Sequence, residues 1–346
     1  MEIIFGVDFG TTNSAIAIND GGRVRVVSVD TDNEGKPLDI LRSALFFDRR
    51  RKVSVGQEAV RKYVEDCTDG RFMRSIKTLL PMEVFTSTQV WGEAYKVEDL
   101  VAIILTNLKH KAEREVGKTI NTAVLGRPVM FSTNPGEEQL AEDRLRSAAS
   151  LAGFNKIVFQ FEPIAAALAF ESTLGVGEKK TVLIGDFGGG TSDFTVIKLT
   201  GGNVSSNRDR RSDILSLSGV YVGGDTFDSM LVWDKIAHYF GRGVNLSIGD
   251  GGSLPLPTTI THKLKGWHLL PQLRDRQIRG YLREIRGRVD DPQAIRRLEE
   301  LIDTNRLFEI FQSMERIKCE LSNAESADFL FEELDYTIAF ALHRHE

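Results

Sequence analysis

The sequence contains a short pattern that occurs twice, and this repeat constrains the fold more than any other feature. Asp8-Phe9-Gly10 and Asp186-Phe187-Gly188 each follow an apolar run, and their aspartates lie 178 positions apart (186 − 8) in a chain of 346 residues. A turn that contains Gly and Thr comes next in both copies, followed by an alternating apolar run that begins at Ser14 or Ser192. Two alternating runs around a turn predict a β-hairpin. The sequence therefore predicts an internal duplication, with one hairpin in each half.

The turns of the two predicted hairpins have the chemistry of a phosphate site. Glycines let a phosphate approach the backbone N–H groups closely, and threonine hydroxyls add further donors. An aspartate at the end of the first strand can hold Mg²⁺, usually through water. No GxxxxGK[ST] segment is present and a strand follows each turn, so neither a P-loop nor a Rossmann fingerprint is predicted. A tight hairpin without a ligand remains the alternative for either copy alone, and it explains the matched pair less well.

Segments with helical and strand-like spacing alternate between the hairpins and predict a layered α/β domain. The predicted helices there cover residues 97–117, 137–152 and 162–172, and the predicted strands cover 122–125 and 157–161. Beyond the second hairpin, the sequence predicts a strand at 214–217, a helix at 225–240, a loop at 241–257, helices within 274–325 and two short strands within 328–345.

Composition and charge exclude several classes of protein. A net charge of −5 argues against a dedicated nucleic-acid binder, because such a protein needs a basic face. The basic runs 49–52 and 208–211 are short and predict solvated loops. The apolar runs are too short for a membrane span, and no secretory signal is readable at the N-terminus. Cys67 and Cys319 form no CxxC pattern, which disfavours a disulfide scaffold or a zinc site. We expect a cytoplasmic protein that binds neither nucleic acid nor membranes.

Three segments together resemble the nucleotide-binding (ATPase) domain of the 70-kDa heat-shock chaperones of the DnaK type. They are residues 6–14 (GVDFGTTNS), 162–169 (EPIAAALA) and 186–193 (DFGGGTSD). Residues 223–228 (GGDTFD) and the spacing Glu315-x-x-Lys318-x-x-Leu321-Ser322 extend the resemblance over nearly the whole chain, in the family's order. The segment Gly126-Arg127-Pro128 and the short chain are more similar to a divergent branch of stand-alone, chaperone-like proteins.

The resemblance implies an α/β, actin-like ATPase fold, in which two ribonuclease H-like lobes surround a nucleotide cleft. Lobe I is expected at residues 1–175, with an inserted subdomain. Lobe II is expected at residues 176–346, with the second phosphate hairpin and a helical upper subdomain. The second lobe is expected to be incomplete at its C-terminal end, because no Gly-Gly-Ser-x-Arg-type adenosine motif follows Ser322. A peptide-binding β-domain is not expected in this chain either.

The resemblance also implies roles for individual residues. Asp8 and Asp186 are expected to hold the hydrated Mg²⁺ of bound ATP or ADP. The expected catalytic residues are Lys77, which neutralises charge on the γ-phosphate, the carboxylates Glu162 and Asp193, which order the attacking water, and Thr191. The expected nucleotide contacts are Gly10, Thr11, Thr12, Asn13, Gly188, Gly189, Gly190, Gly223, Gly224, Glu315, Lys318 and Ser322.

Simpler interpretations of four of these residues remain open. Lys77 alone would be taken for a surface lysine, Glu162 for a carboxylate that favours a helix N-terminus, and Glu315 with Lys318 for a surface pair. Two departures from the family stand out. Cys319 replaces the arginine that stacks on adenine, and no arginine with the family's relay role follows the hinge proline, Pro128.

The expected function is that of an ATP-binding, chaperone-like protein with slow, Mg²⁺-dependent ATP hydrolysis that drives lobe closure. Client proteins and co-chaperones are the partners implied by the resemblance. The alternatives are a nucleotide-gated, actin-like scaffold, a degenerate pseudo-ATPase and, with less support, a small-molecule kinase. A kinase would need an acceptor pocket with a catalytic aspartate, which the sequence does not display.

Overall fold

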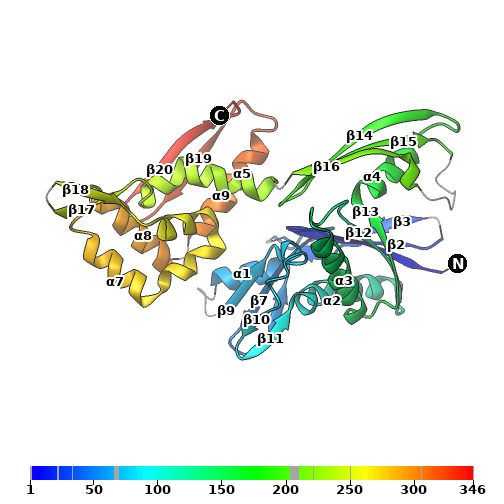
Figure 1. The fold of residues 1–346 in the computed structure, drawn as a ribbon, viewed down its shortest axis with the longest axis horizontal. Coiled ribbons are helices and arrows are strands. Elements are labelled where there is room, and N and C mark those ends of the chain that lie inside the picture. Colours follow the sequence, from blue (N-terminus) through cyan, green and yellow to red (C-terminus); the bar gives the residue numbers. More distant parts are fainter. Residues whose placement is uncertain are drawn as a thin grey trace. The chain divides into compact units, whose positions relative to one another are not determined.

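The computed structural model describes residues 2–21, 23–32, 34–65, 70–202, 210–220, 222–249, 251–304 and 306–345. Contacts divide the chain into two compact units, Met1–Gly224 and Asp225–Glu346. Both units contain helices and strands (Figure 1), which confirms the mixed α/β class. The assignment of lobes to residues 1–175 and 176–346 concerns the family's plan and stays a prediction.

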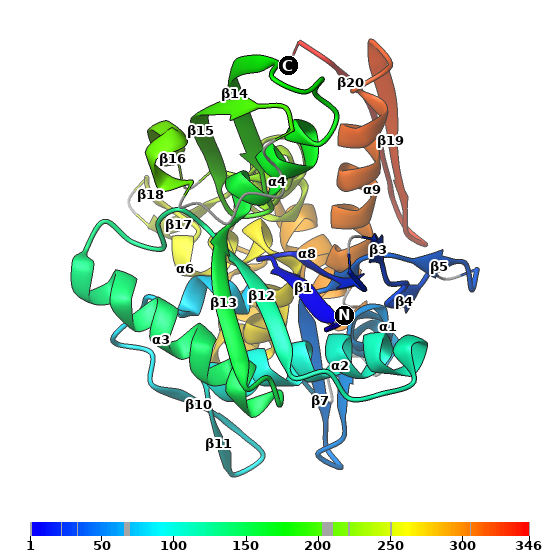
Figure 2. The ribbon, with the colours of Figure 1, turned by 90° about the vertical axis from the view of Figure 1, so that its right-hand side faces the viewer.

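The first unit is built on a mixed sheet with the strand order β13-β12-β1-β2-β3, and β6 also pairs with β2. Its strands are β1 (Ile4–Phe9), β2 (Asn13–Asn19), β3 (Val24–Val26), β6 (Leu41–Arg42), β12 (Thr122–Arg127) and β13 (Lys156–Phe161). β1 runs antiparallel to β2 and parallel to β12, which is parallel to β13. Figure 2 shows β13, β12 and β1 side by side.

The core of this unit lies between the sheet and two helices, α2 (Val97–Val116) and α3 (Pro135–Leu151). Burial alternates along β1, where Phe5, Val7 and Phe9 are buried, as the period of a half-buried strand requires. The apolar stripe of α2 packs against β2 and α3. Both helices begin and end within two residues of the predicted bounds.

A segment between β2 and α2 adds a second, smaller sheet with the order β8-β7-β9. Its elements are β7 (Ala44–Asp48), β8 (Val53–Val55), α1 (Gln57–Glu65) and β9 (Gly70–Arg74). Short hairpins flank it, namely β4 (Asp30–Thr31) with β5 (Pro37–Leu38) and β10 (Ser87–Val90) with β11 (Glu93–Lys96). The 3₁₀ turn η1 (Ile76–Leu79) follows β9 and carries Lys77.

The second predicted hairpin forms an antiparallel sheet with the order β14-β15-β16. Its strands are β14 (Lys179–Phe187), β15 (Ser192–Thr200) and β16 (Ile214–Val220), with the turn η2 (Arg211–Asp213) before β16. Helix α4 (Glu162–Glu171) covers one face, where Ile164 and Ala167 pack with Ile197 and Leu199.

The second unit is mostly helical. Helix α5 (Gly224–Leu231) continues as the π-helix η3 (Val232–Ile236) and the 3₁₀ helix η4 (Ala237–Phe240), and it ends at Gly241, whose φ is 100°. The later elements are β17 (Asn245–Gly249), β18 (Gly252–Pro255), α6 (Thr258–Thr261), η5 (His262–Lys265), η6 (Trp267–Arg274), α7 (Arg276–Ile285), α8 (Pro292–Thr304), α9 (Leu307–Glu320), β19 (Ser326–Glu332) and β20 (Thr337–His343).

Two sequence-based predictions were wrong in detail. Residues 241–257 were expected to be a loop, but they contain the hairpin β17–β18, because their glycines and prolines mark turns within and beside the strands. The basic run at 208–211 was expected to be solvated. Residues 208 and 209 lie outside the described residues, but the side chain of Arg210 is only 9% exposed and pairs with Glu171 and Asp213. Of the described residues, none belongs to a helix that is both long and apolar enough to cross a membrane.

Candidate functional site

The two repeated hairpins have the same register. In the first, Phe9 faces Ser14 across the turn, and in the second, Phe187 faces Ser192. Both serines are buried, and their hydroxyls form hydrogen bonds, Ser14 with Oγ of Ser43 at 2.8 Å and Ser192 with the carbonyl of Val222 at 2.7 Å. The duplication seen in the sequence therefore extends to strand pairing and to the burial of the first residue after each turn.

The turns of the two hairpins lie against each other within the first unit. A Cβ atom placed on Gly190 would lie 3.3 Å from the Thr11 side chain, a tight contact that shows how closely the two turns approach. Gly223 is more restricted, because its Cβ would meet the backbone carbonyl oxygen of Gly188 at 2.6 Å, and the N–H of Gly224 donates to the same oxygen at 3.0 Å. The predicted phosphate-binding residues 10–13, 188–190 and 223–224 thus belong to one region.

Lys77 and Glu162, which are 85 positions apart in the chain, form an ion pair. The Lys77 Nζ atom lies 2.7 Å from the Glu162 Oε1 atom, and the two side chains are only 11% and 17% exposed. Glu162 begins α4 with Pro163 next to it, so the helix N-terminus fixes the carboxylate. Reading Lys77 as an ordinary surface lysine is therefore wrong.

The predicted metal and catalytic carboxylates form one electrostatic group around this pair. Asp8 is exposed by its surface area, yet the protein atoms packed around its carboxyl group displace enough water to raise its pKa to about 6. The negative charges of Glu162 and Asp186 raise this pKa further, whereas Lys77 lowers it. Burial also raises the pKa of Asp193, and Glu162 and Asp186 act in the same direction.

Carboxylate oxygens are the ligands that Mg²⁺ prefers, and Mg²⁺ commonly uses one or two of them together with waters and substrate phosphates. The pair Asp8 and Asp186 fits such an ion, because a divalent cation would favour the charged form of Asp8 and offset the repulsion from Glu162 and Asp186, which adds to the effect of burial on its pKa. Within the described ranges, no three His, Cys, Asp or Glu residues are grouped closely enough to hold a metal ion by themselves.

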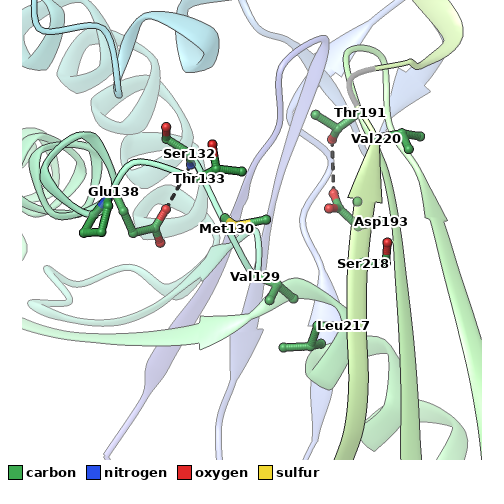
Figure 3. A pocket seen from close by; sticks show the side chains of 12 residues that line it. Val129, Met130, Ser132, Thr133, Glu138, Thr191, Asp193, Leu217, Ser218 and Val220 are labelled. Carbon is green, nitrogen blue, oxygen red and sulfur yellow. Dashed lines mark hydrogen bonds between the residues drawn. The ribbon is translucent and has the colours of Figure 1, made fainter.

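A cavity of about 480 Å³ opens beside Thr191 and Asp193 (Figure 3). Its walls are the loop after β12, the first turn of α3 and the strand β16. The Thr191 hydroxyl donates to Oδ2 of Asp193 at 3.1 Å, and this bond turns the carboxylate along the cavity wall (Figure 3). A Cβ atom on Gly219 would lie 2.5 Å from Oδ1 of Asp193, so any side chain at this position of β16 would push the Asp193 carboxylate aside.

The predicted adenosine contacts belong to the second unit. Glu315 and Lys318 are on α9, and Ser322 follows its last turn. Lys318 Nζ lies 2.7 Å from Oδ1 of Asp228 on α5, so it joins the two helices. The exposed Cys319 is its neighbour. The adenosine role of these residues stays a prediction.

Sequence reasoning missed several residues that support the site. Gly126 on β12 is one, because a Cβ there would lie 3.2 Å from the Cγ atom of Glu162. A glycine within a strand pattern signals such a close approach, and this signal was available. Arg127 is another, since it pairs with Glu138 and Glu142 on α3 and its guanidinium lies 5.0 Å from the Phe131 ring.

Comparison with protein families gives one result. The family model described as Hsp70 protein matches residues 4–250, which include both hairpins, Lys77, Glu162 and the paired glycines 223 and 224.

Proposed function

Since this chain belongs to the Hsp70 family, we propose that it binds Mg²⁺-ATP at the two adjoining hairpins and hydrolyses it slowly. Family membership supports an ATP-binding, chaperone-like role, and nucleotide-dependent lobe closure is part of our proposal. Client proteins and co-chaperones are the partners that we propose on the same ground.

The observation that carries the proposal is the contact between the two glycine turns in matched register. Gly190 lies against Thr11, and the two turns together offer backbone N–H groups and threonine hydroxyls. Such groups bind phosphate oxygens without the cost of dehydrating a charged side chain. The carboxylates and Lys77 beside them supply what a triphosphate with its metal requires, namely metal ligands and a cation.

The proposed chemistry assigns one task to each side chain. Bound Mg²⁺ would neutralise phosphate charge, and Asp8 and Asp186 would hold it through its waters. Lys77, kept in place by Glu162, would stabilise the charge that develops on the transferred phosphoryl group. Asp193, oriented by the Thr191 hydroxyl, would orient the attacking water and accept its proton. The raised pKa of Asp193 makes it a better base than an ordinary aspartate.

Calorimetric titration with Mg²⁺-ATP and Mg²⁺-ADP, followed by single-turnover hydrolysis, tests the proposal. Lys77→Ala and Asp186→Ala should abolish turnover and leave the fold intact, as judged by circular dichroism. Lys179→Ala on β14 and Asp328→Ala on β19 are matched controls, because both side chains are exposed and lie outside the site. Turnover equal to wild type in both site variants would refute the assignment. Binding without turnover in the wild-type chain would favour a pseudo-ATPase.

A further inference from the structure

Lys77 sits on a short segment whose backbone is strained. Ser75 has φ 55° and ψ 32°, the left-handed conformation that residues with a side chain rarely adopt. The 3₁₀ turn η1 follows at once, and Ile76 and Leu80 on either side of Lys77 are fully buried. A strained residue of this kind persists only where its surroundings hold it. Something must therefore hold the segment that follows Ser75.

The carbonyl of Ser75 accepts the N–H and the hydroxyl of Thr78 at 3.1 and 2.7 Å, and Arg144 of α3 binds the stretch of chain that follows. Its Nη1 atom donates to the carbonyl oxygens of Leu79, Leu80 and Met82 at 3.2, 2.9 and 3.0 Å. Its Nη2 atom donates to the carbonyl oxygen of Phe85 at 2.9 Å. A guanidinium has several N–H donors in one plane, so a single side chain can gather four carbonyls, and these bonds carry the strength of a charged donor.

The first two of these carbonyls belong to the last residue of η1 and to the residue after it, and the Leu79 carbonyl also accepts the N–H of Met82 at 3.2 Å. Arg144 therefore holds the end of the turn that begins with Ser75 and contains Lys77. Among the described residues, Arg144 forms no ion pair with a carboxylate, and its guanidinium group donates to the backbone carbonyls of this segment instead. Its neighbour Arg146 differs, because it pairs with Glu142 and its guanidinium lies 4.6 Å from the Phe159 ring.

We propose that Arg144 is a positioning residue for Lys77: by holding the carbonyls of residues 79–85, it keeps the Lys77 ammonium against Glu162. Without these bonds, the turn is free to relax Ser75 to an ordinary conformation, and this rotation moves the Lys77 side chain away from its partner. The inference rests on the proposed function only for its catalytic consequence. Its geometric consequence, a Lys77 ammonium released from Glu162, is independent of any activity.

The test uses the full chain with Arg144→Met and Arg144→Lys, and Arg146→Met as the matched control on the same helix. The first readout is the rate at which the Lys77 amine is reductively methylated, measured by mass spectrometry against Lys179 in the same sample. We expect labelling of Lys77 to rise about fivefold or more in both Arg144 variants, because the ion pair opens locally. Arg146→Met should stay within about twofold of wild type.

The second readout is turnover of Mg²⁺-ATP. The kcat of the Arg144 variants should fall about tenfold or more with KM nearly unchanged, since a misplaced group slows the reaction without weakening binding. Combined with Lys77→Met, the Arg144 variants should cause no further loss. If Arg144→Met does not fold, Arg144→Lys decides, because it keeps the charge but cannot reach four carbonyls.

The outcomes separate the two proposals. If the wild-type chain does not hydrolyse ATP, the proposed function fails, and the labelling of Lys77 still decides the role of Arg144. Wild-type labelling of Lys77 in both Arg144 variants overturns the inference. A lowered melting temperature with labelling and kcat unchanged also overturns it, because Arg144 would then serve stability alone.

Discussion

Replacement of Arg210 by Met should destabilise the first unit strongly, and the structure gives the size of the effect. The Arg210 guanidinium makes two bonds to Glu171, at 2.8 and 2.9 Å, and one to Asp213 at 2.6 Å. Glu171 is fully buried at the end of α4, and it also accepts the N–H of Thr200 at 2.8 Å. Removing the cation takes these two charged hydrogen bonds from a buried carboxylate.

Removing one partner of a buried ion pair costs about 3–5 kcal/mol, because the other charge stays inside the protein with less compensation. Glu171→Gln keeps the shape of the side chain and removes the charge, so its cost should be smaller, about 1.5–3 kcal/mol from the lost charged hydrogen bonds. The double variant should lose much less than the sum of the two, since it removes both charges together.

Urea unfolding of the single and double variants measures these free energies, and hydrogen exchange of α4 and β15 assigns the loss to this unit. Arg51→Met is the matched control, because Arg51 pairs with Glu93 at the surface with both side chains at least half exposed. An exposed pair contributes only about 0–1 kcal/mol. Equal losses for Arg210→Met and Arg51→Met, or strictly additive losses in the double variant, would refute the reasoning.

Three further outcomes follow from the site. Because burial raises the folded pKa of Asp8 to about 6, the folded state holds the proton more tightly than the unfolded chain, so this group lowers stability as the pH rises towards 6. Affinity for Mg²⁺-ADP should weaken as the pH falls below that value, and calorimetry at several pH values, with Asp8→Asn as control, measures it. Lys77→Met should lower turnover about 10²-fold or more while Mg²⁺-ADP binding changes little, as single-turnover assays and calorimetry can show. Gly126→Ala should slow turnover several-fold, because the new methyl presses on Glu162; Gly6→Ala on β1, where a Cβ meets nothing within 4 Å, is its control.

The sequence predicted the parts of this protein that depend on neighbours along the chain. The two hairpins were readable because alternation of apolar residues around a glycine turn specifies local pairing, and their common register followed. Helices α2 and α3 were equally readable from their apolar spacing. The hairpin β17–β18 was missed, because glycines and prolines within a short strand pair look like those of an irregular loop.

The supporting contacts of the site could not be read in the same way, because they join segments far apart in the chain. Lys77 meets Glu162 and Arg144 meets the carbonyl oxygen of Leu79 only after the sheet and α3 have packed. Every residue has a backbone carbonyl. The sequence therefore does not show which carbonyls a cation such as Arg144 binds. Arg210 shows the same limit, since a run of arginines reads as solvated until a buried carboxylate such as Glu171 is placed beside it.

The charge balance of the site explains why binding and stability oppose each other there. Asp8, Glu162, Asp186 and Asp193 act on one another, while the ammonium of Lys77 offsets only part of their charge and is held by Glu162. Burial raises the pKa values of Asp8 and Asp193 most, and the neighbouring negative charges of Glu162 and Asp186 raise them further, so both carboxylates hold a proton more readily than an ordinary aspartate. A divalent cation that arrives with a nucleotide offsets the repulsion from those charges, and therefore competes with the protons. The residues that destabilise the empty site are thus those that would bind Mg²⁺-ATP, and replacing Asp8 by Asn should stabilise the nucleotide-free protein near neutral pH while weakening its affinity for the metal–nucleotide complex.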